Sequence, residues 1–447
     1  MILRKGAIPL ALLLSGCATY TSRPLDDAGT ALTPPVPSVL EAKANAIQRP
    51  WLKPVTLDLS KPLTPDAIAT IAVINNPDLK AQRVRAGVTD AQVFAAGLLP
   101  DPSVSLGANK VITGPDPFLD LASALGLDIN ALRTRGVTRA RAEADARQVR
   151  LDLAWAEWQT AGQARIQAAR IEGLTEIVAL AQKSQTVAQS LLTRIQRATA
   201  RGDVADDRLQ AARLSELNAA QTLRTAQGNL AAAREELDKL LGFPPGTRFA
   251  LAPVALPPAP PAVATLFAVA RKDRTDLAAL RAGYQSQEAS VHKAVLDQFP
   301  NLTLTINANR DSAGNFMVGP AVDFTLPLWN RNRGGIAVAR ATRAALKAEY
   351  DARLFQTRAD IGAAVAGIRV AMRQRADALK GLPEVRHYAQ ASRRAEAHGD
   401  LSLESALNAE QALRDRRMLI AQSDTDIVQQ MIALELLTGA PRETWPQ

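Results

Sequence analysis

Residues 301–309 carry the pattern that decides the fold, and they read Asn301-Leu-Thr-Leu-Thr-Ile-Asn-Ala-Asn309. Apolar and polar side chains alternate strictly, so a β-strand here has one apolar face and one polar face. The next segment, residues 319–328, alternates in the same way. Such strands fit a half-buried sheet on a soluble core, or the wall of a membrane barrel that faces lipid on one side and a water-filled lumen on the other. The residues expected to face a lumen are Thr303, Thr305, Asn307 and Asp323.

A second pair of alternating segments lies about 200 residues earlier, at about 102–110 and 118–129. Short sequences recur at nearly the same offset; for example, Gly202-Asp203-Val204 returns as Gly399-Asp400-Leu401. Recurrence in a fixed order indicates an internal duplication. The chain therefore has four such strands. Because the smallest membrane barrels have eight strands, a barrel would have to be shared between chains.

The segments after each strand pair are long and helical. Residues 133–200 lack proline and would form a helix of about 100 Å at 1.5 Å per residue. Residues 205–241 follow, and the second copy has helices at 336–397 and 401–437. Within 209–240, leucine or alanine occupies nearly every a and d position of a heptad, which is typical of a coiled coil. In the last helix one of these rows is polar and is expected to face a different environment, such as a water-filled interior; it contains Arg416, Ser423 and Gln430.

The composition of the 447 residues excludes several classes of protein. An apolar fraction of 47 % is too high for a disordered chain, one cysteine excludes a disulfide framework, and three histidines argue against a metal site. We find no catalytic motif, so we expect no catalytic residue and no enzyme activity. With 53 basic and 44 acidic residues the net charge is +9. Because basic and acidic residues are interspersed along the chain, we expect no nucleic-acid partner.

The N-terminus indicates export. Two basic residues precede the apolar run Ala7–Leu14, which is too short to span a bilayer, and the run leads into Leu14-Ser-Gly-Cys17. This resembles the lipobox of a bacterial lipoprotein. Cleavage before Cys17 would leave that residue carrying a diacylglycerol and an N-acyl chain, with no other cofactor. Ala18 follows where an aspartate often signals inner-membrane retention, so the sequence favours the outer membrane.

Together these features resemble the TolC family of outer-membrane efflux proteins over about residues 64–440. The most specific segment is residues 324–336, Phe-Thr-Leu-Pro-Leu-Trp-Asn-Arg-Asn-Arg-Gly-Gly-Ile, which is similar to the strand-to-helix junction of the family's heavy-metal-efflux branch. Asn76-Pro-Asp-Leu79 also matches a family signature. The resemblance implies a homotrimer with a 12-stranded barrel in the outer membrane and a helical tunnel in the periplasm. It also implies two partners, a membrane-fusion adaptor and an inner-membrane pump of the resistance-nodulation-division (RND) type.

The resemblance places the periplasmic tip at the two helical turns. The adaptor-facing residues would be Gly202, Asp203, Gly399 and Asp400. The residues expected around the aperture are Glu396, Glu404, Ser405 and Asn408. Well-studied members narrow the entrance with acidic residues, and Ser405 and Asn408 occupy those positions here, so a carboxylate gate is not carried over to them.

The sequence thus predicts a mainly α, internally duplicated protomer with a small β part, acting as the exit duct of a tripartite efflux system. The expected parts are a signal peptide (1–16), a linker after the lipidated cysteine (17–63), a first repeat (64–242), a Pro/Ala-rich connector (243–263), a second repeat (264–439) and a tail (440–447). The alternative is a lipid-anchored periplasmic adaptor or spacer without a channel, although an adaptor should have one helical hairpin and more strands. The exported cargo stays open among metal ion, drug and solvent.

Overall fold

The computed structural model describes residues 20–25, 33–52, 54–110, 112–113, 119–311 and 314–446. The chain divides into two units, residues 1–34 and 35–447, and all helices and strands described below belong to the second. The elements, in chain order, are α1 (Pro37–Ala46), α2 (Pro65–Asn75), α3 (Pro77–Gly97), β1 (Ser103–Lys110), β2 (Leu119–Asp128), α4 (Ile129–Ala200), α5 (Asp206–Leu241), α6 (Val263–Asp273), α7 (Thr275–Leu296), β3 (Leu302–Arg310), β4 (Phe316–Phe324), α8 (Arg333–His398), α9 (Leu403–Thr438) and the short 3₁₀ helix η3 (Arg442–Thr444).

The elements occur twice in the same order, as the recurring sequences predict. A short helix, a medium helix, two strands, a very long helix and a final helix run from α2 to α5 and again from α6 to α9. The long helices have 72 and 66 residues, and both final helices have 36. At 1.5 Å per residue, α4 is about 108 Å long.

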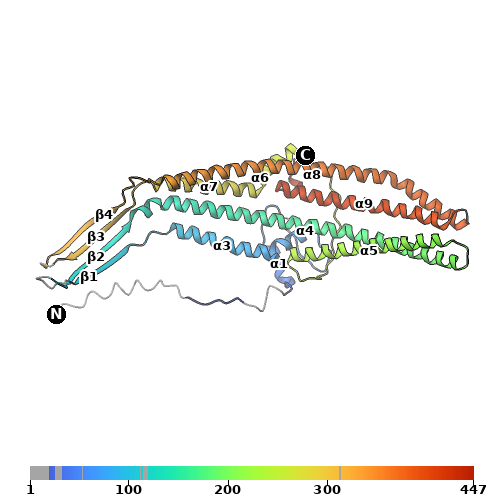
Figure 1. Ribbon diagram of the computed structural model, residues 1–447, viewed down its shortest axis with the longest axis horizontal. Helices are drawn as coiled ribbons and strands as arrows, with labels where there is room; N and C mark the ends of the chain where they lie inside the picture. The colour runs from blue at the N-terminus through green and yellow to red at the C-terminus, as the bar shows by residue number, and fades with distance from the viewer. Residues whose placement is uncertain are drawn as a thin grey trace. The chain divides into compact units, whose positions relative to one another are not determined.

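Within residues 35–447 the elements lie nearly parallel, with the strands at one end and the α4–α5 and α8–α9 turns at the other (Figure 1). The long helix α4 packs against α3 and then α5 along one side, and against α7 and then α9 along the other. In the same way α8 packs against α7 and then α9. Each long helix is therefore accompanied by two shorter ones, and the α4–α7 and α4–α9 contacts join the two repeats.

The four strands form one antiparallel sheet in the order β1-β2-β3-β4, so β1 and β4 are its edges. The sequence predicts the fourth strand at about 319–328, which is wrong at both ends. Pairing begins at Phe316 opposite Arg310 and stops at Phe324. It stops there because Pro327 lacks an N–H and restricts the residue before it, and the amide of Leu328 instead turns back to the carbonyl of Leu326 at 2.9 Å.

In both repeats, side chains at the junction of the two shorter helices donate hydrogen bonds to the C-terminal end of the final helix. Asn75 and Asn76, between α2 and α3, donate side-chain hydrogen bonds to carbonyls at the end of α5, with the Asn75 amide 2.7 Å from Leu241 O. In the second repeat Arg274, between α6 and α7, donates to Leu437 O at 3.0 Å at the end of α9. The unpaired carbonyls of a helix C-terminus need such partners. The Asn-Pro-Asp-Leu signature thus fixes where three helices meet.

Within the expected linker and tail, residues 37–46 and 442–444 form helices. Leu40 and Ala44 lie four residues apart on one face of α1, and both are buried in the core that α2, α4 and α5 build. Residue Leu63 pairs with Leu251 of the connector. At the other end, Trp445 is 8 % exposed and packs with α6, α8 and α9. Only the folded helices supply the partners of these apolar side chains.

The expectation that the polar row of α9 faces a water-filled interior is also wrong. Ser423 is 4 % exposed. Gln430 and Arg416 lie against Gly367 and Gly381 of α8, where a Cβ would come within 2.9 Å and 3.4 Å of their side chains. The row is polar because the facing helix has glycine there, which leaves room for long side chains between the two backbones.

Candidate functional site

The two helical turns far from the sheet have the same backbone geometry. Gly202 and Gly399 have φ values of +79° and +84°, in the left-handed region that glycine adopts without strain. In each turn the next residue donates its N–H to a carbonyl at the helix end, Asp203 to Ala198 and Asp400 to Ala395, both at 2.9 Å. This is the Schellman ending of a helix. A Cβ on either glycine would meet nothing within 4 Å, so backbone angle and not space requires these glycines.

Two of the expected aperture residues join the hairpins. Glu396 of α8 lies 3.9 Å from Arg194 of α4, and Glu404 of α9 lies 3.5 Å from Arg208 of α5. Both arginines and Glu404 are exposed and Glu396 is partly exposed, so each pair contributes little to stability. Ser405 donates its N–H to the capping hydroxyl of Ser402 at the start of α9.

The fourth aperture residue, Asn408, lines a groove of about 590 Å³ between α4, α5 and α9. The same groove contains Arg414, which the sequence analysis did not single out. Arg414 of α9 is 9 % exposed, and its Nε donates to Ser184 Oγ of α4 at 3.1 Å. Burial lowers the pKa of Arg414 more than the nearby Glu410 carboxylate raises it. An arginine next to a seam leucine carries no sequence signal for burial, because its partner is 230 residues away.

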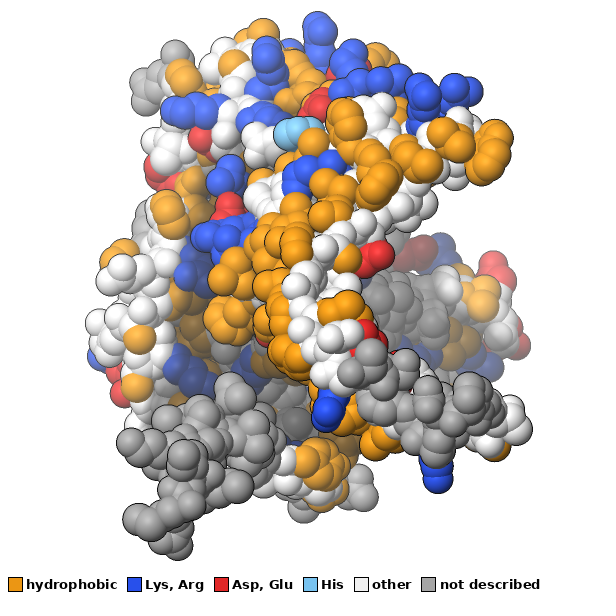
Figure 2. Space-filling model, turned by 90° about the vertical axis from the view of Figure 1, so that its left-hand side faces the viewer, with side chains coloured by type: hydrophobic (Ala, Val, Ile, Leu, Met, Phe, Trp, Pro, Cys, Tyr) orange, Lys and Arg blue, Asp and Glu red, His pale blue; other side chains and the backbone are white. Residues whose placement is uncertain are grey.

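The sheet has one apolar and one polar face, because residues paired across antiparallel strands point the same way. Thr303 pairs with Asp323, and Thr305 and Asn307 lie at alternate positions along β3, so the four residues expected to face a lumen share one face. The opposite face carries exposed apolar side chains on every strand. These include Leu106, Leu121, Leu304, Ile306, Val318 and Phe324, between 40 % and 82 % exposed. Figure 2, which looks onto the strand end, shows hydrophobic side chains in contiguous patches there.

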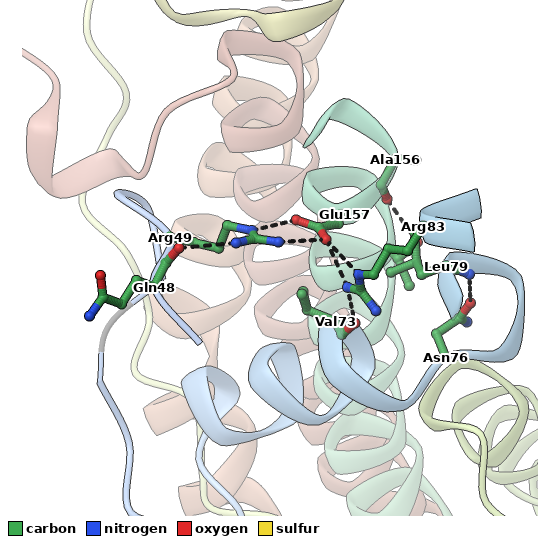
Figure 3. Close-up of polar contacts among 9 residues, drawn as sticks. Gln48, Arg49, Val73, Asn76, Leu79, Arg83, Ala156 and Glu157 are labelled. Carbon is green, nitrogen blue, oxygen red and sulfur yellow. Dashed lines mark hydrogen bonds and ion pairs between the residues drawn. The ribbon is translucent and has the colours of Figure 1, made fainter. Parts of the chain in front are cut away.

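A buried carboxylate fastens the N-terminal segment to α4 (Figure 3). The Glu157 side chain is 1 % exposed and accepts hydrogen bonds from Arg49 Nε at 2.6 Å and Arg83 Nη2 at 2.7 Å. Burial alone would raise the pKa of Glu157, but the hydrogen bonds and charges of the two arginines outweigh it, and the pKa lies below its ordinary value. Nearby, Trp51 packs edge-on against Trp158 with ring centroids 5.1 Å apart.

The contact between the repeats depends on two glycines of α4. A Cβ on Gly162 would lie 2.2 Å from Leu436 Cδ2 of α9, and one on Gly173 would lie 1.9 Å from Thr425 Oγ1. Real Cβ atoms do not approach that closely. The two sites are three helical turns apart on both helices, so α4 and α9 lie in close contact along this stretch.

Neither a metal centre nor a helical membrane span is found in the part of the chain that the structure describes. No three His, Cys, Asp or Glu residues there are placed to hold a metal ion, and no helix there is long and apolar enough to cross a membrane. The histidines His292, His387 and His398 are exposed. Cys17, the expected lipidation site, lies outside the described residues.

Several solved structures with this architecture are described as outer-membrane channels. The chain is similar to CusC, whose crystal structures are described for conformational changes that accompany folding and transmembrane channel formation; the TM-score is 0.70 at 16 % identity over 95 % of this chain and 99 % of that one. It is similar to the Campylobacter jejuni CmeC outer membrane channel, with a TM-score of 0.68 at 16 % identity over 89 % and 91 % of the two chains. It is also similar to the open state of the Neisseria gonorrhoeae MtrE outer membrane channel, with a TM-score of 0.66 at 16 % identity over 83 % of this chain and 88 % of that one.

No curated protein matches the chain. The model of the family described as "Outer membrane efflux protein" matches residues 266–440, which is nearly the whole second repeat. The structural likenesses extend the same fold over both repeats, at identities that carry the fold alone. The resemblance to the TolC family is thus confirmed: residues 266–440 belong to the outer membrane efflux protein family by sequence, and the chain as a whole has the fold of these channels.

Proposed function

We propose that this protein is the outer-membrane exit duct of a tripartite efflux system and conducts cargo passively from a pump and adaptor to the cell exterior. The observation that carries the proposal is the two-faced sheet. Its apolar face is half to four-fifths exposed at many positions, where a soluble protein would leave at most a small apolar patch. Such a face needs a hydrophobic surrounding, and a bilayer supplies one.

The barrel forms between copies of the chain. The four-stranded sheet leaves β1 and β4 as edges, and unpaired strand edges cannot stand in lipid. Three copies joined edge to edge give twelve strands and no free edge. The same circular arrangement brings the long helices side by side as a tunnel. Because α4 is about 108 Å long, this tunnel extends deep into the periplasm.

The turns at Gly202 and Gly399 form the end of that tunnel and dock a periplasmic adaptor, which connects the duct to an inner-membrane pump of the RND type. The pump supplies energy and selects cargo, and the duct performs no catalysis. Two salt bridges, Arg194–Glu396 and Arg208–Glu404, join neighbouring hairpins near this end. They are weak enough to be exchanged when an adaptor binds.

We also propose that the mature chain begins at a lipidated Cys17 and is held in the outer membrane by both lipid and barrel. Downstream of Cys17, Leu40 and Ala44 pack in the helical core and Arg49 pairs with Glu157, so this part of the N-terminal region is attached to the helices. A lipid-anchored spacer without a channel would need the same anchor, but it gives no reason for an exposed apolar sheet face.

The test is the oligomeric state of the full-length protein in outer-membrane extracts. Unheated samples should run as trimers in detergent gels and heated samples as monomers. Replacing Gly202 and Gly399 with valine should leave the trimers intact and weaken co-purification of the periplasmic adaptor, because valine strains the left-handed turn by about 1–2 kcal/mol. A protein that is always monomeric and peripheral would refute the duct.

A further inference from the structure

The segment between β4 and α8, at the junction of the sheet and the helices (Figure 1), carries exposed apolar side chains where no strand pairing remains. Residues 325–332 read Thr-Leu-Pro-Leu-Trp-Asn-Arg-Asn. Pairing with β3 ends at Phe324, yet Leu326 and Leu328 are exposed and Trp329 is 86 % exposed. The exposed apolar surface of the sheet is therefore followed directly by a further apolar surface at the start of the helices.

The backbone of this segment holds an uncommon conformation. Arg331 and Asn332 have φ values of +45° and +48°, and in the described part of the chain no other residue except glycine has a positive φ. The Asn332 side chain donates to Ala294 O of α7 at 2.8 Å. A Cβ on Gly335 would lie 2.4 Å from Asn332 Oδ1, so glycine there makes room for the asparagine. The bend is thus fixed against α7 without any contact from the side chain of Arg331.

The segment lines a groove of about 570 Å³ between β4, α7 and the start of α4 and α8. Leu326, Leu328 and Trp329 contribute apolar side chains to it. Its charged residues are Lys293, Asp297 and Arg331, and the first two form an ion pair at 2.7 Å. Arg331 therefore gives the groove a net positive charge next to an apolar wall.

The arginines around this groove do not pair with carboxylates of the protein. Arg331 and Arg333 are exposed, and among the residues that the structure describes no carboxylate lies within ion-pair distance of either. Arg133 at the start of α4 donates to a side-chain amide and to a backbone carbonyl. By contrast, Arg139 and Arg343, about three helical turns into α4 and α8, both pair with glutamates. The positive charge at the junction is therefore available to a ligand.

We infer that this groove binds the headgroup of an anionic phospholipid, whose phosphate lies between Arg331 and Arg333. The inference rests on the proposed function, in which the sheet lies in the bilayer and the helices in the periplasm. The junction then lies at the periplasmic surface of the outer membrane, where aromatic side chains of membrane barrels gather. The acyl chains of the lipid pack against Leu326, Leu328 and Trp329.

The chemistry of the groove favours an anionic headgroup over a zwitterionic one. The planar guanidinium group of arginine matches the geometry of a phosphate. A zwitterionic headgroup adds an ammonium group, and the one carboxylate of the groove, Asp297, is already paired with Lys293. Each basic residue beside an anionic lipid surface strengthens binding about fivefold, so removing Arg331 and Arg333 should weaken it roughly twentyfold.

The experiment is native mass spectrometry of the purified full-length protein in non-ionic detergent, titrated with dioleoyl phosphatidylglycerol or dioleoyl phosphatidylethanolamine. It measures the lipid concentration at which half of the trimers carry a bound lipid, and the trimer mass shows in each spectrum that a variant has assembled. For phosphatidylglycerol, Arg331→Gln/Arg333→Gln should raise this concentration roughly twentyfold. Trp329→Ala should raise it for both lipids, because both have the same acyl chains.

The matched control is Arg369→Gln/Arg373→Gln. It removes two exposed arginines of the same helix, about 50 Å from Arg333, and should leave lipid binding unchanged. A second measurement needs no variant. Raising ammonium acetate from about 0.1 M to about 1 M shortens the screening length from about 10 Å to about 3 Å, so it should weaken the binding of phosphatidylglycerol much more than that of phosphatidylethanolamine.

A preference for phosphatidylglycerol that salt and the Arg331/Arg333 variant remove, and that the control variant keeps, supports the inference. Equal binding of the two lipids by the wild type overturns it, as does an equal loss in both double variants. Complete displacement of phosphatidylglycerol by free glycerol phosphate also overturns it, because the site would then recognise phosphate and not a lipid. A wild-type protein that gives no trimer at all overturns the proposed function itself.

Discussion

Adding one methyl group at three glycines of the same helix should give opposite effects on stability, depending only on what faces each glycine. Gly136, Gly162 and Gly173 all lie inside α4. Replacing any of them with alanine should favour the helix by about 1 kcal/mol, because glycine is the poorer helix former. A Cβ on Gly136 meets nothing within 4 Å, so Gly136→Ala should show this gain in full.

At the other two positions the new methyl group collides with α9. At Gly162 it would lie within 2.8 Å of three atoms of the Leu436 side chain, which is only 9 % exposed and has little room to move. At Gly173 it would lie 2.8 Å from Thr425 Cβ, an atom that no side-chain rotation can remove. Overpacking of this kind costs about 1–3 kcal/mol, and the lower end applies to Leu436 and the upper end to Thr425. Net losses should therefore be about 0–1 kcal/mol for Gly162→Ala and about 1–2 kcal/mol for Gly173→Ala.

The assay is urea unfolding of the full-length protein in detergent, followed by circular dichroism at 222 nm. The midpoints should rank Gly136→Ala above wild type, then Gly162→Ala, then Gly173→Ala. The difference between the first and last variants should be about 2–3 kcal/mol in the free energy of unfolding. If all three variants raise the midpoint equally, α4 and α9 do not lie in close contact, and the account of how the repeats join is wrong.

Three further predictions concern the Glu157 ion pairs, the sheet and the N-terminus. Glu157→Gln should lower the free energy of unfolding by about 1.5–3 kcal/mol at pH 7, because it removes the negative charge with which Arg49 and Arg83 pair. Because the pKa of Glu157 is lower in the folded protein, the wild type should keep this stability at pH values above the ordinary glutamate pKa and lose it as pH falls through the pKa of the folded state. A plot of the unfolding midpoint against pH should therefore be flatter for the variant than for the wild type. Parallel plots would contradict the pairing of Glu157 with the two arginines. Leu304→Lys on the apolar face should reduce the yield of membrane-inserted trimers, since a lysine in lipid costs about 2–4 kcal/mol, whereas Thr305→Lys on the polar face should not; equal yields on detergent gels would count against the face assignment. Cys17→Ser should abolish incorporation of labelled palmitate, and continued labelling would place the lipid elsewhere.

Local patterns in the sequence predict the fold where one segment contains its own signal. Strict alternation identifies β3, the absence of proline identifies α4, and matched turns at Gly202 and Gly399 indicate the duplication. The docked N-terminal segment and the tail could not be predicted, because Leu40 and Trp445 find their partners only once distant helices have assembled.

In the candidate site too, features with a local sequence pattern could be predicted, and features that depend on contacts between distant helices could not. The shared face of Thr303, Thr305 and Asp323 follows from period two alone. The burial of Arg414 against Ser184 does not, because it depends on the rotation of α9 about its axis relative to α4. The polar seam of α9 was misread for a related reason: Gln430 has room only because Gly367 faces it from α8. A pattern on one helix does not report the size of the residues on the next.

Several copies of this chain should enclose one continuous water-filled passage. Single-channel recording of the purified full-length protein in planar bilayers detects such a passage. We expect discrete, uniform conductance steps from the trimeric fraction of a detergent gel-filtration run and none from heat-dissociated monomer. A trimeric, correctly folded fraction that never conducts would contradict it.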